Sequence, residues 1–186
     1  MRRGQWLLIG VLLGLGTGSA AAVDGWVLDG GRGFPSLGPG NEGTATRFGL
    51  TWDWPWRWLE DGDWELSGQW EVTAGTLVED DDDNAPITEV IEGGLVGMAR
   101  LARYRQNAGG PYLELGVGPH YLSDKQLDSV RLATHFQFQS IAGFGSRFGE
   151  NGRFELGYRI MHLSNAGIDT PNPGLNYHLL HFAYRY

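Results

Sequence analysis

The segment Phe154-Glu155-Leu156-Gly157-Tyr158-Arg159-Ile160-Met161-His162-Leu163-Ser164 alternates between two rows of side chains. Because successive side chains of a β-strand point to opposite faces, the row that begins with Phe154 lies on one face, and the row with the glutamate and the arginine lies on the other. The first row is apolar as far as Ile160 and then ends in His162 and Ser164. If this face contacts lipid, a histidine and a serine lie at the membrane surface.

The same two-residue period recurs along the chain, with turn residues between the segments. In one segment Phe48, Leu50 and the tryptophans from Trp52 to Trp58 alternate with mostly polar residues. We count eight such segments, at residues 24–32, 44–58, 63–77, 88–104, 111–122, 134–148, 152–164 and 175–186. Eight is the strand number of the smallest closed membrane barrels, so the pattern predicts an all-β, eight-stranded antiparallel β-barrel.

Alternation alone does not distinguish a membrane barrel from a soluble, lipocalin-like barrel, because both have an apolar face. Two features of the strands favour the membrane. The apolar rows become aromatic toward their ends, as in the interfacial girdles of outer-membrane barrels. The opposite rows collect charges that suit a polar interior, namely Glu65, Glu71, Glu92, Arg100, Glu114, Glu155 and Arg159.

The connections between the segments alternate in length. Tight connections lie near residues 60–62, 107–110 and 150–152, and longer ones near residues 33–43, 78–87, 123–133 and 165–174. Short periplasmic turns that alternate with long outer loops are typical of outer-membrane barrels. The aromatic residues from Phe182 to Tyr186 also resemble the terminal strand that the outer-membrane insertion machinery recognises. We therefore expect a transmembrane β-barrel of the bacterial outer membrane.

Residues 1–22 are typical of a secretory signal peptide. Arg2 and Arg3 precede an apolar stretch over residues 6–16, and small residues follow at positions 19–22. This stretch is shorter than the roughly 18 residues that a membrane helix needs, and no later window reaches that length. We expect cleavage after Ala22 and a single barrel domain over residues 23–186.

The composition argues against several other classes of protein. Without Arg2 and Arg3, 12 basic residues remain against 22 acidic ones, a net charge of −10, so a nucleic acid partner is not expected. The chain has no cysteine, which excludes disulfides and thiolate metal sites. It also contains no HExxH and no GxSxG motif, so zinc-protease and ordinary α/β-hydrolase chemistry have no support.

His162 and Ser164 are the first candidates for chemistry. Their two-residue spacing places both side chains on one face, roughly 6 to 7 Å apart at the backbone. A serine hydroxyl becomes a nucleophile when an imidazole accepts its proton, and a third group must hold that imidazole in the right tautomer. In the last segment, residues 175–186, Asn176 belongs to the row that carries the apolar side chains. It lies at the end of this segment that follows the 165–174 loop, so we expect it beside His162 and Ser164.

The motif from Met161 to Gly167, followed by Pro171-Asn172-Pro173-Gly174-Leu175-Asn176, resembles the signature of the PagL-like lipid A 3-O-deacylase family. The motif covers only about 15 residues, and the signal peptide, strand count and aromatic terminus agree with it. The resemblance implies an outer-membrane esterase that removes the ester-linked acyl chain at the 3 position of lipid A in lipopolysaccharide.

The resemblance also implies roles for individual residues. It assigns the general base to His162 and the nucleophile to Ser164, and it places Asn165, Gly167 and Asn172 in the surrounding motif. An asparagine amide or a backbone N–H there would stabilise the oxyanion of a tetrahedral intermediate. We expect Asn165 to do this before Asn172, because Asn172 lies between two prolines and can brace the loop. No metal or other cofactor is expected.

Asn176 departs from the family pattern, in which a glutamate is the third member of the triad. An amide accepts a hydrogen bond from imidazole but supplies no negative charge. Three interpretations follow: a working Ser-His-Asn variant, a substitute acid such as Asp169 from the loop, or a barrel that has lost activity. In the last case the protein is a structural or adhesion-type outer-membrane barrel that retains the motif.

The remaining charged and imidazole groups have simpler interpretations. His178 shares the apolar parity and is expected to be an interfacial residue, while His181 lies on the opposite row and cannot chelate a metal with it. His120 and His135 are widely separated in sequence. The acidic run at residues 79–83 is expected to be a solvated loop tip, with divalent-cation binding at lipopolysaccharide phosphates as the alternative.

Overall fold

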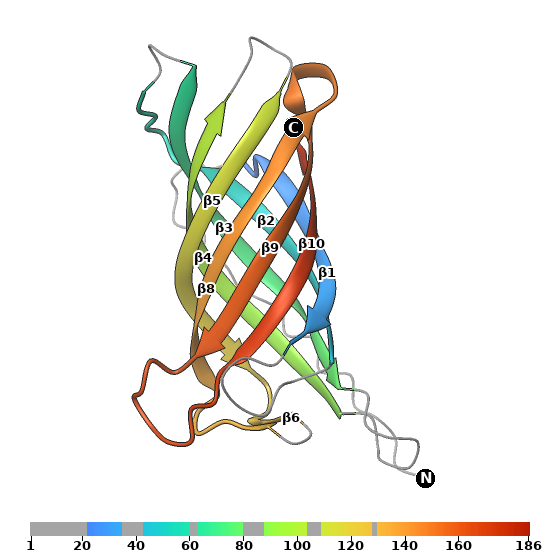
Figure 1. The fold of residues 1–186 in the computed structure, drawn as a ribbon, viewed down its shortest axis with the longest axis vertical. Helices are drawn as coiled ribbons and strands as arrows, with labels where there is room; N and C mark the ends of the chain where they lie inside the picture. Colours follow the sequence, from blue (N-terminus) through green and yellow to red (C-terminus); the bar gives the residue numbers. More distant parts are fainter. Residues whose placement is uncertain (1–21, 35–42, 60–62, 80–87, 104–108, 128–129) are drawn as a thin grey trace.

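Eight strands form one closed antiparallel barrel in the computed structural model, which describes residues 22–34, 43–59, 63–79, 88–103, 109–127 and 130–186 (Figure 1). The barrel strands are β1 (Gly25–Gly33), β2 (Thr44–Asp53), β3 (Trp64–Glu79), β4 (Thr88–Arg103), β5 (Gly110–Leu122), β8 (Phe136–Phe148), β9 (Phe154–Ser164) and β10 (Leu175–Arg185). Neighbours in the chain are neighbours in the barrel, and β1 closes it against β10. The predicted fold class is confirmed.

Strand β2 is shorter than the sequence pattern predicts. It ends at Asp53, whereas the alternation continues to Trp58. The reason is Pro55, which has no N–H to donate to the neighbouring strand and starts a bend. Beyond the bend, the described residues form one isolated bridge, between Trp58 and Leu66.

Three short elements were not expected from the sequence. The strands β6 (Gln126–Leu127) and β7 (Val130–Arg131) pair with each other in the long connection between β5 and β8. A 3-10 turn, η1 (Glu150–Gly152), joins β8 to β9. Two-residue strands and single turns are too short to give a periodic signal in the sequence.

The outer surface of the barrel is apolar and the inner surface of its middle part is charged. Among the exposed apolar side chains are Leu115, Leu156 and Leu180, which are 65%, 56% and 68% exposed. Such a surface suits contact with lipid tails. No helix in the described part of the chain is long and apolar enough to cross a membrane.

The charged interior is built around three arginines. Arg159 donates hydrogen bonds to Asp29, Glu71 and Glu114, and its side chain is fully buried. Arg100 pairs with Glu114 and Glu155, both at 2.9 Å, and the third arginine, Arg47, pairs with Glu92 at 3.0 Å. The alternation correctly predicted that these rows face inward.

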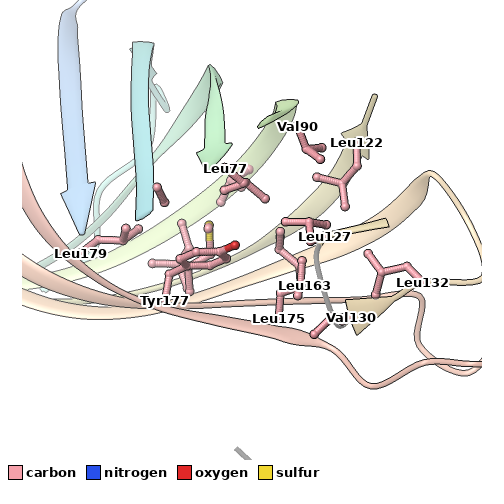
Figure 2. Close-up of a cluster of buried hydrophobic side chains, with 14 of the residues drawn as sticks. Leu77, Val90, Leu122, Leu127, Val130, Leu132, Leu163, Leu175, Tyr177 and Leu179 are labelled. Carbon is pink, nitrogen blue, oxygen red and sulfur yellow. The ribbon is translucent and has the colours of Figure 1, made fainter. Parts of the chain in front are cut away.

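A second, apolar layer fills the barrel at the end that carries β6 and the 165–174 loop (Figures 1 and 2). Figure 2 shows side chains from the barrel wall meeting three residues of the β6–β7 segment, Leu127, Val130 and Leu132. All three are at most 1% exposed. This layer fills the lumen at the loop end of the barrel. A ligand that binds at this end therefore approaches from the outer surface of the barrel.

Candidate active site

Strand β9 delivers His162 and Ser164 to the outer surface of the barrel at its last three residues. In the register of the sheet, His162 lies opposite Asn176 of β10 on one side and opposite Ser140 of β8 on the other. The strand ends at Ser164, where the chain turns into the loop over residues 165–174. The site is therefore at the rim of the barrel wall, beside one loop and facing outward.

The ring of His162 is held by Asn176. The Nδ1 atom lies 2.8 Å from Asn176 Oδ1, and Asn176 is 9% exposed while the ring is half-buried. An amide oxygen only accepts hydrogen bonds, so the Nδ1 atom donates and carries the ring proton. The Nε2 atom of the neutral ring then has the free lone pair, which is the tautomer that a general base needs.

Ser164 is half-buried and lies on the same face of β9 as His162. No hydrogen bond joins its hydroxyl to the ring within the described residues. The backbone spacing of roughly 6 to 7 Å allows the two side chains to converge by rotation. Such bonds are often long in an empty site and shorten only with the substrate in place. The structure thus joins two of the three predicted residues directly and leaves the third beside them.

Asn165 and Asn172 hold the loop that follows Ser164. Asn165 is 1% exposed; its Nδ2 donates to the carbonyl of Asp169 at 2.8 Å, and its Oδ1 accepts from Gly167 N at 2.9 Å. Asn172 Oδ1 accepts from the backbone N–H of Asn165 at 3.0 Å. These bonds fix both the backbone after Ser164 and the direction of the Asn165 amide.

Asp169 does not contact the imidazole in the structure. Its Oδ1 atom accepts from the N–H of Thr170 at 2.8 Å, and the residue is exposed. The partner that His162 Nδ1 has here is Asn176. This geometry favours the Ser-His-Asn interpretation over a substitute acid.

Gly174 lies beside the ring of His162; the sequence motif contains this glycine but assigned it no role. A Cβ atom at this position would lie 2.8 Å from Cε1 of His162, and the backbone φ of 73° is one that only glycine adopts readily. Gly174 directly precedes β10, the strand that carries Asn176. The signal available in the sequence was the Pro173-Gly174 pair at the end of the loop, which indicates a turn but not its contact with the histidine.

An apolar groove of about 530 Å³ runs along the outer wall from His162. Small residues of three strands lie in it, namely Gly97, Ala99, Gly116, Ser140 and Ala142, and larger ones border it, namely Trp54, Leu115, Val117 and Ile160. The sequence pattern placed most of these residues on the lipid-facing rows, but their meeting across four strands depends on the register. The site therefore has an apolar groove beside His162, and its lining suits a hydrocarbon chain.

The other histidines have structural partners. His178 bonds the Tyr158 hydroxyl and stacks on Phe34 with ring centres 3.9 Å apart, as expected for an interfacial residue. His181 lies inside the barrel and pairs with Asp29. His120 pairs with Glu92.

His135 contacts the carbonyl of Leu122 at 2.8 Å. No group of three or more metal-binding side chains occurs among the residues that the structure covers. Residues 80–83 of the acidic run lie outside the described part of the chain.

Comparisons with known proteins agree in sequence and in fold. The profile of the lipid A 3-O-deacylase (PagL) family matches residues 42–185. The chain is 28% identical over 143 residues to the lipid A deacylase PagL of Pseudomonas aeruginosa, which covers 77% of this chain and 79% of that protein. It is 36% identical over 75 residues to the lipid A deacylase PagL of Bordetella bronchiseptica, covering 40% and 41%. The crystal structure of the outer membrane enzyme PagL has the same fold, with a TM-score of 0.73 at 22% identity over 87% of this chain and 99% of that one.

Proposed function

Because the chain belongs to the lipid A 3-O-deacylase (PagL) family, we propose that it is an outer-membrane esterase that hydrolyses the 3-O-linked acyl chain of lipid A with Ser164 and His162. The observation that carries this mechanism is the 2.8 Å hydrogen bond between His162 Nδ1 and Asn176 Oδ1 on the outer wall of the barrel. It supports an imidazole that is oriented as a base, two residues from a serine, at the end of a lipid-sized groove.

The reaction proceeds through an acyl-enzyme. Ser164 Oγ attacks the carbonyl carbon of the ester while His162 Nε2 takes the hydroxyl proton. The tetrahedral intermediate collapses, and the imidazolium returns the proton to the 3-oxygen of the glucosamine, which leaves as an alcohol. Water, deprotonated by the same imidazole, then attacks the acyl-serine and releases the free fatty acid. These covalent steps need no metal, and the proposal assigns none.

Asn165 is assigned to the oxyanion of the tetrahedral intermediate. Among the residues that the structure describes, one of its two amide hydrogens is used, by the carbonyl of Asp169. The bond from Gly167 N to its Oδ1 keeps the oxygen turned toward Gly167, so the Nδ2 group is the end that remains for a developing negative charge. Asn172 holds the backbone of Asn165.

Asn176 serves as the orienting member of the triad. It accepts from Nδ1 and so selects the productive tautomer, which is the main contribution of the third group. It does not stabilise the imidazolium by charge. The third member is therefore weaker than a carboxylate, and we expect a slower turnover than a carboxylate would allow.

The substrate reaches the site laterally from the outer leaflet. The apolar layer formed with Leu127 and Leu132 fills the barrel at the loop end, whereas the groove beside His162 opens on the outer wall. Delivery to that membrane requires export, and we assign this to residues 1–22 as a signal peptide that is removed after Ala22. Residues 1–21 lie outside the described part of the chain.

The decisive experiment compares lipid A from outer membranes that contain the wild-type protein or the Ser164→Ala variant. Mass spectrometry should show loss of the 3-O-acyl chain with the wild-type protein, and at least a roughly 10³-fold lower rate with the variant, since the nucleophile is gone. Ser146→Ala, an exposed serine of β8 distant from the site, is the matched control and should behave as wild type.

A structural or adhesion-type barrel is the second candidate, favoured by the amide at Asn176 in place of an acid. Identical lipid A from membranes with the wild-type protein, with Ser164→Ala and with no protein would establish that alternative and end the esterase proposal.

A further inference from the structure

We propose that the indole of Trp54 forms the end wall of the apolar groove and limits the length of the acyl chain that the protein cleaves. The inference rests on the proposed function, because it places the ester carbonyl between Ser164 and His162 and the acyl chain in the groove that His162 borders. The occupant is a single acyl chain, since one end of the groove is the candidate catalytic base.

The groove crosses four strands from the candidate base to Trp54. His162 of β9 lies opposite Ser140 of β8, Ser140 opposite Val117 of β5, and Val117 opposite Gly97 of β4. Figure 1 shows β9, β8 and β5 side by side on one face of the barrel. Three inter-strand spacings amount to about 14 Å, which is close to half of the roughly 30 Å hydrocarbon thickness of a bilayer. The groove therefore has the length of one acyl layer.

Trp54 is packed at the far end of this path. A Cβ atom on Gly97 would lie 3.4 Å from Cζ2 of Trp54 and 3.0 Å from Cζ3 of Trp70. The Trp54 ring also covers Gly68 so closely that a Cβ there would come within 1.9 Å of its Cε3 atom. The wall is thus an indole fitted onto a glycine, and only a residue without a side chain at Gly68 leaves room for it.

The neighbouring aromatic rings hold the indole in this position. Trp70 meets it edge-on with ring centres 5.4 Å apart, and the ring centre of Trp56 lies 4.8 Å from that of Trp54. The Nε1 atom of Trp54 is buried and has no hydrogen-bond partner among the described residues. Packing and not hydrogen bonding therefore sets the position of the wall, so a smaller side chain would open it.

The end of the groove at Trp54 is steric. The indole also borders a polar cavity lined among others by Glu65, Gln69 and Arg100, but this cavity belongs to the charged interior of the barrel. The barrel wall separates it from the groove, so a chain on the outer surface is stopped by the indole and by Trp70 beside it.

The length limit comes from exclusion and not from hydrophobic attraction. An acyl chain in the outer leaflet is already among other lipid tails, so moving it into the groove removes little apolar surface from water. A chain that is too long must bend out of the groove, which displaces its ester from Ser164. We expect each carbon beyond the limit to lower kcat/KM about tenfold, the lower end of what apolar pockets achieve per methylene.

The test uses the full-length protein in detergent micelles and p-nitrophenyl esters of increasing acyl length. The wild-type protein should show a sharp fall in kcat/KM beyond one chain length. Trp54→Ala should move that fall to longer chains, with at least a tenfold gain on the first ester that the wild type rejects, measured relative to the shortest ester. Trp58→Ala is the matched control, because Trp58 belongs to the same segment, stacks on Trp56 and does not border the groove.

A second variant works in the opposite direction and does not depend on removing the indole. Ala142→Leu fills the groove beside Ile160 and should shift the limit to shorter chains. Unaltered length profiles for both active variants would overturn the role of Trp54 while leaving the esterase standing. If the wild-type protein and Ser164→Ala hydrolyse all esters equally slowly, the proposed function itself fails, and the length limit fails with it.

Discussion

At the scale of single residues, the site depends on how Asn176 and Gly174 hold one imidazole. Asn176 of the neighbouring strand accepts a hydrogen bond from Nδ1, and Gly174 leaves room for the Cε1 edge of the same ring. The amide orients the ring but does not stabilise its charged form. In the proposed mechanism, the missing charge and not the geometry therefore limits the rate.

Replacing the amide by an acid tests this limit. Asn176→Glu should raise kcat for ester hydrolysis at least about tenfold, a fraction of the ~10⁴-fold that separates acid from amide in the serine-protease triad. The gain should appear in kcat and not in KM, because the carboxylate acts on the imidazolium that forms in the transition state. Steady-state kinetics with one ester measure both parameters.

Asn151→Glu is the control for this prediction, because it adds the same charge in the exposed η1 turn at the other end of β9. An equal gain from Asn151→Glu, or no gain from Asn176→Glu, would show that another group orients His162.

At the scale of elements, the β6–β7 segment supports the rim on which the site lies. Its apolar side chains fill the barrel beneath Leu163 and Leu175, which are the strand residues next to Ser164 and Asn176. The segment also contacts the site loop directly, because the N–H of Ala133 donates to the carbonyl of Pro171 at 3.0 Å. The loops at this end thus form one packed unit with the site.

Truncating a buried side chain of this unit should lower stability. We expect Leu127→Ala to reduce the free energy of unfolding by about 2 kcal/mol, the lower end for a buried leucine, because a short segment can relax into the space. Urea unfolding followed by tryptophan fluorescence in lipid vesicles measures the change. Gln126→Ala, the exposed neighbour in the same strand, should leave the midpoint unchanged. Equal midpoints for both variants would mean that the segment does not unfold with the barrel.

At the scale of the whole molecule, the barrel is held together by ion pairs that link distant strands. Five buried carboxylates lie in the described interior, on Asp29, Glu71, Glu92, Glu114 and Glu155. Three of them contact Arg159, which connects β9 with β1, β3 and β5. Charges buried to this degree are tolerated only when they are paired, so Arg159 is the central counter-charge of the fold.

Removing this counter-charge should destabilise the whole barrel. Arg159→Met keeps an unbranched side chain of similar length but leaves three carboxylates short of a partner, at a cost of about 3 to 5 kcal/mol. The same urea titration in vesicles reads out the loss. Arg153→Met changes an exposed arginine directly before β9, the strand that carries Arg159. It should alter the midpoint of the urea titration little. A variant as stable as the wild type would show that the remaining charges rearrange to compensate.

The sequence by itself determined the barrel and placed three candidate residues at its rim. Strand number, strand faces and the charged interior follow from a two-residue period, because alternate side chains must face lipid and lumen in turn. The same parity placed Asn176 beside His162 without any knowledge of the register. The sequence pattern was wrong about the end of β2. The hydrogen-bond ladder stops before Pro55, although the alternation of tryptophans continues to Trp58.

Only the tertiary structure decided which side chains meet across the wall. The apolar layer of Leu127 and Leu132, the contact of Gly174 with His162 and the groove that ends at Trp54 each combine segments that are distant in sequence. Parity says which face a residue occupies, but not its height on that face, because height depends on the stagger of neighbouring strands and on the tilt of the closed barrel. The sequence therefore identified the candidate residues of the proposed site, and the register of the barrel decided what surrounds them.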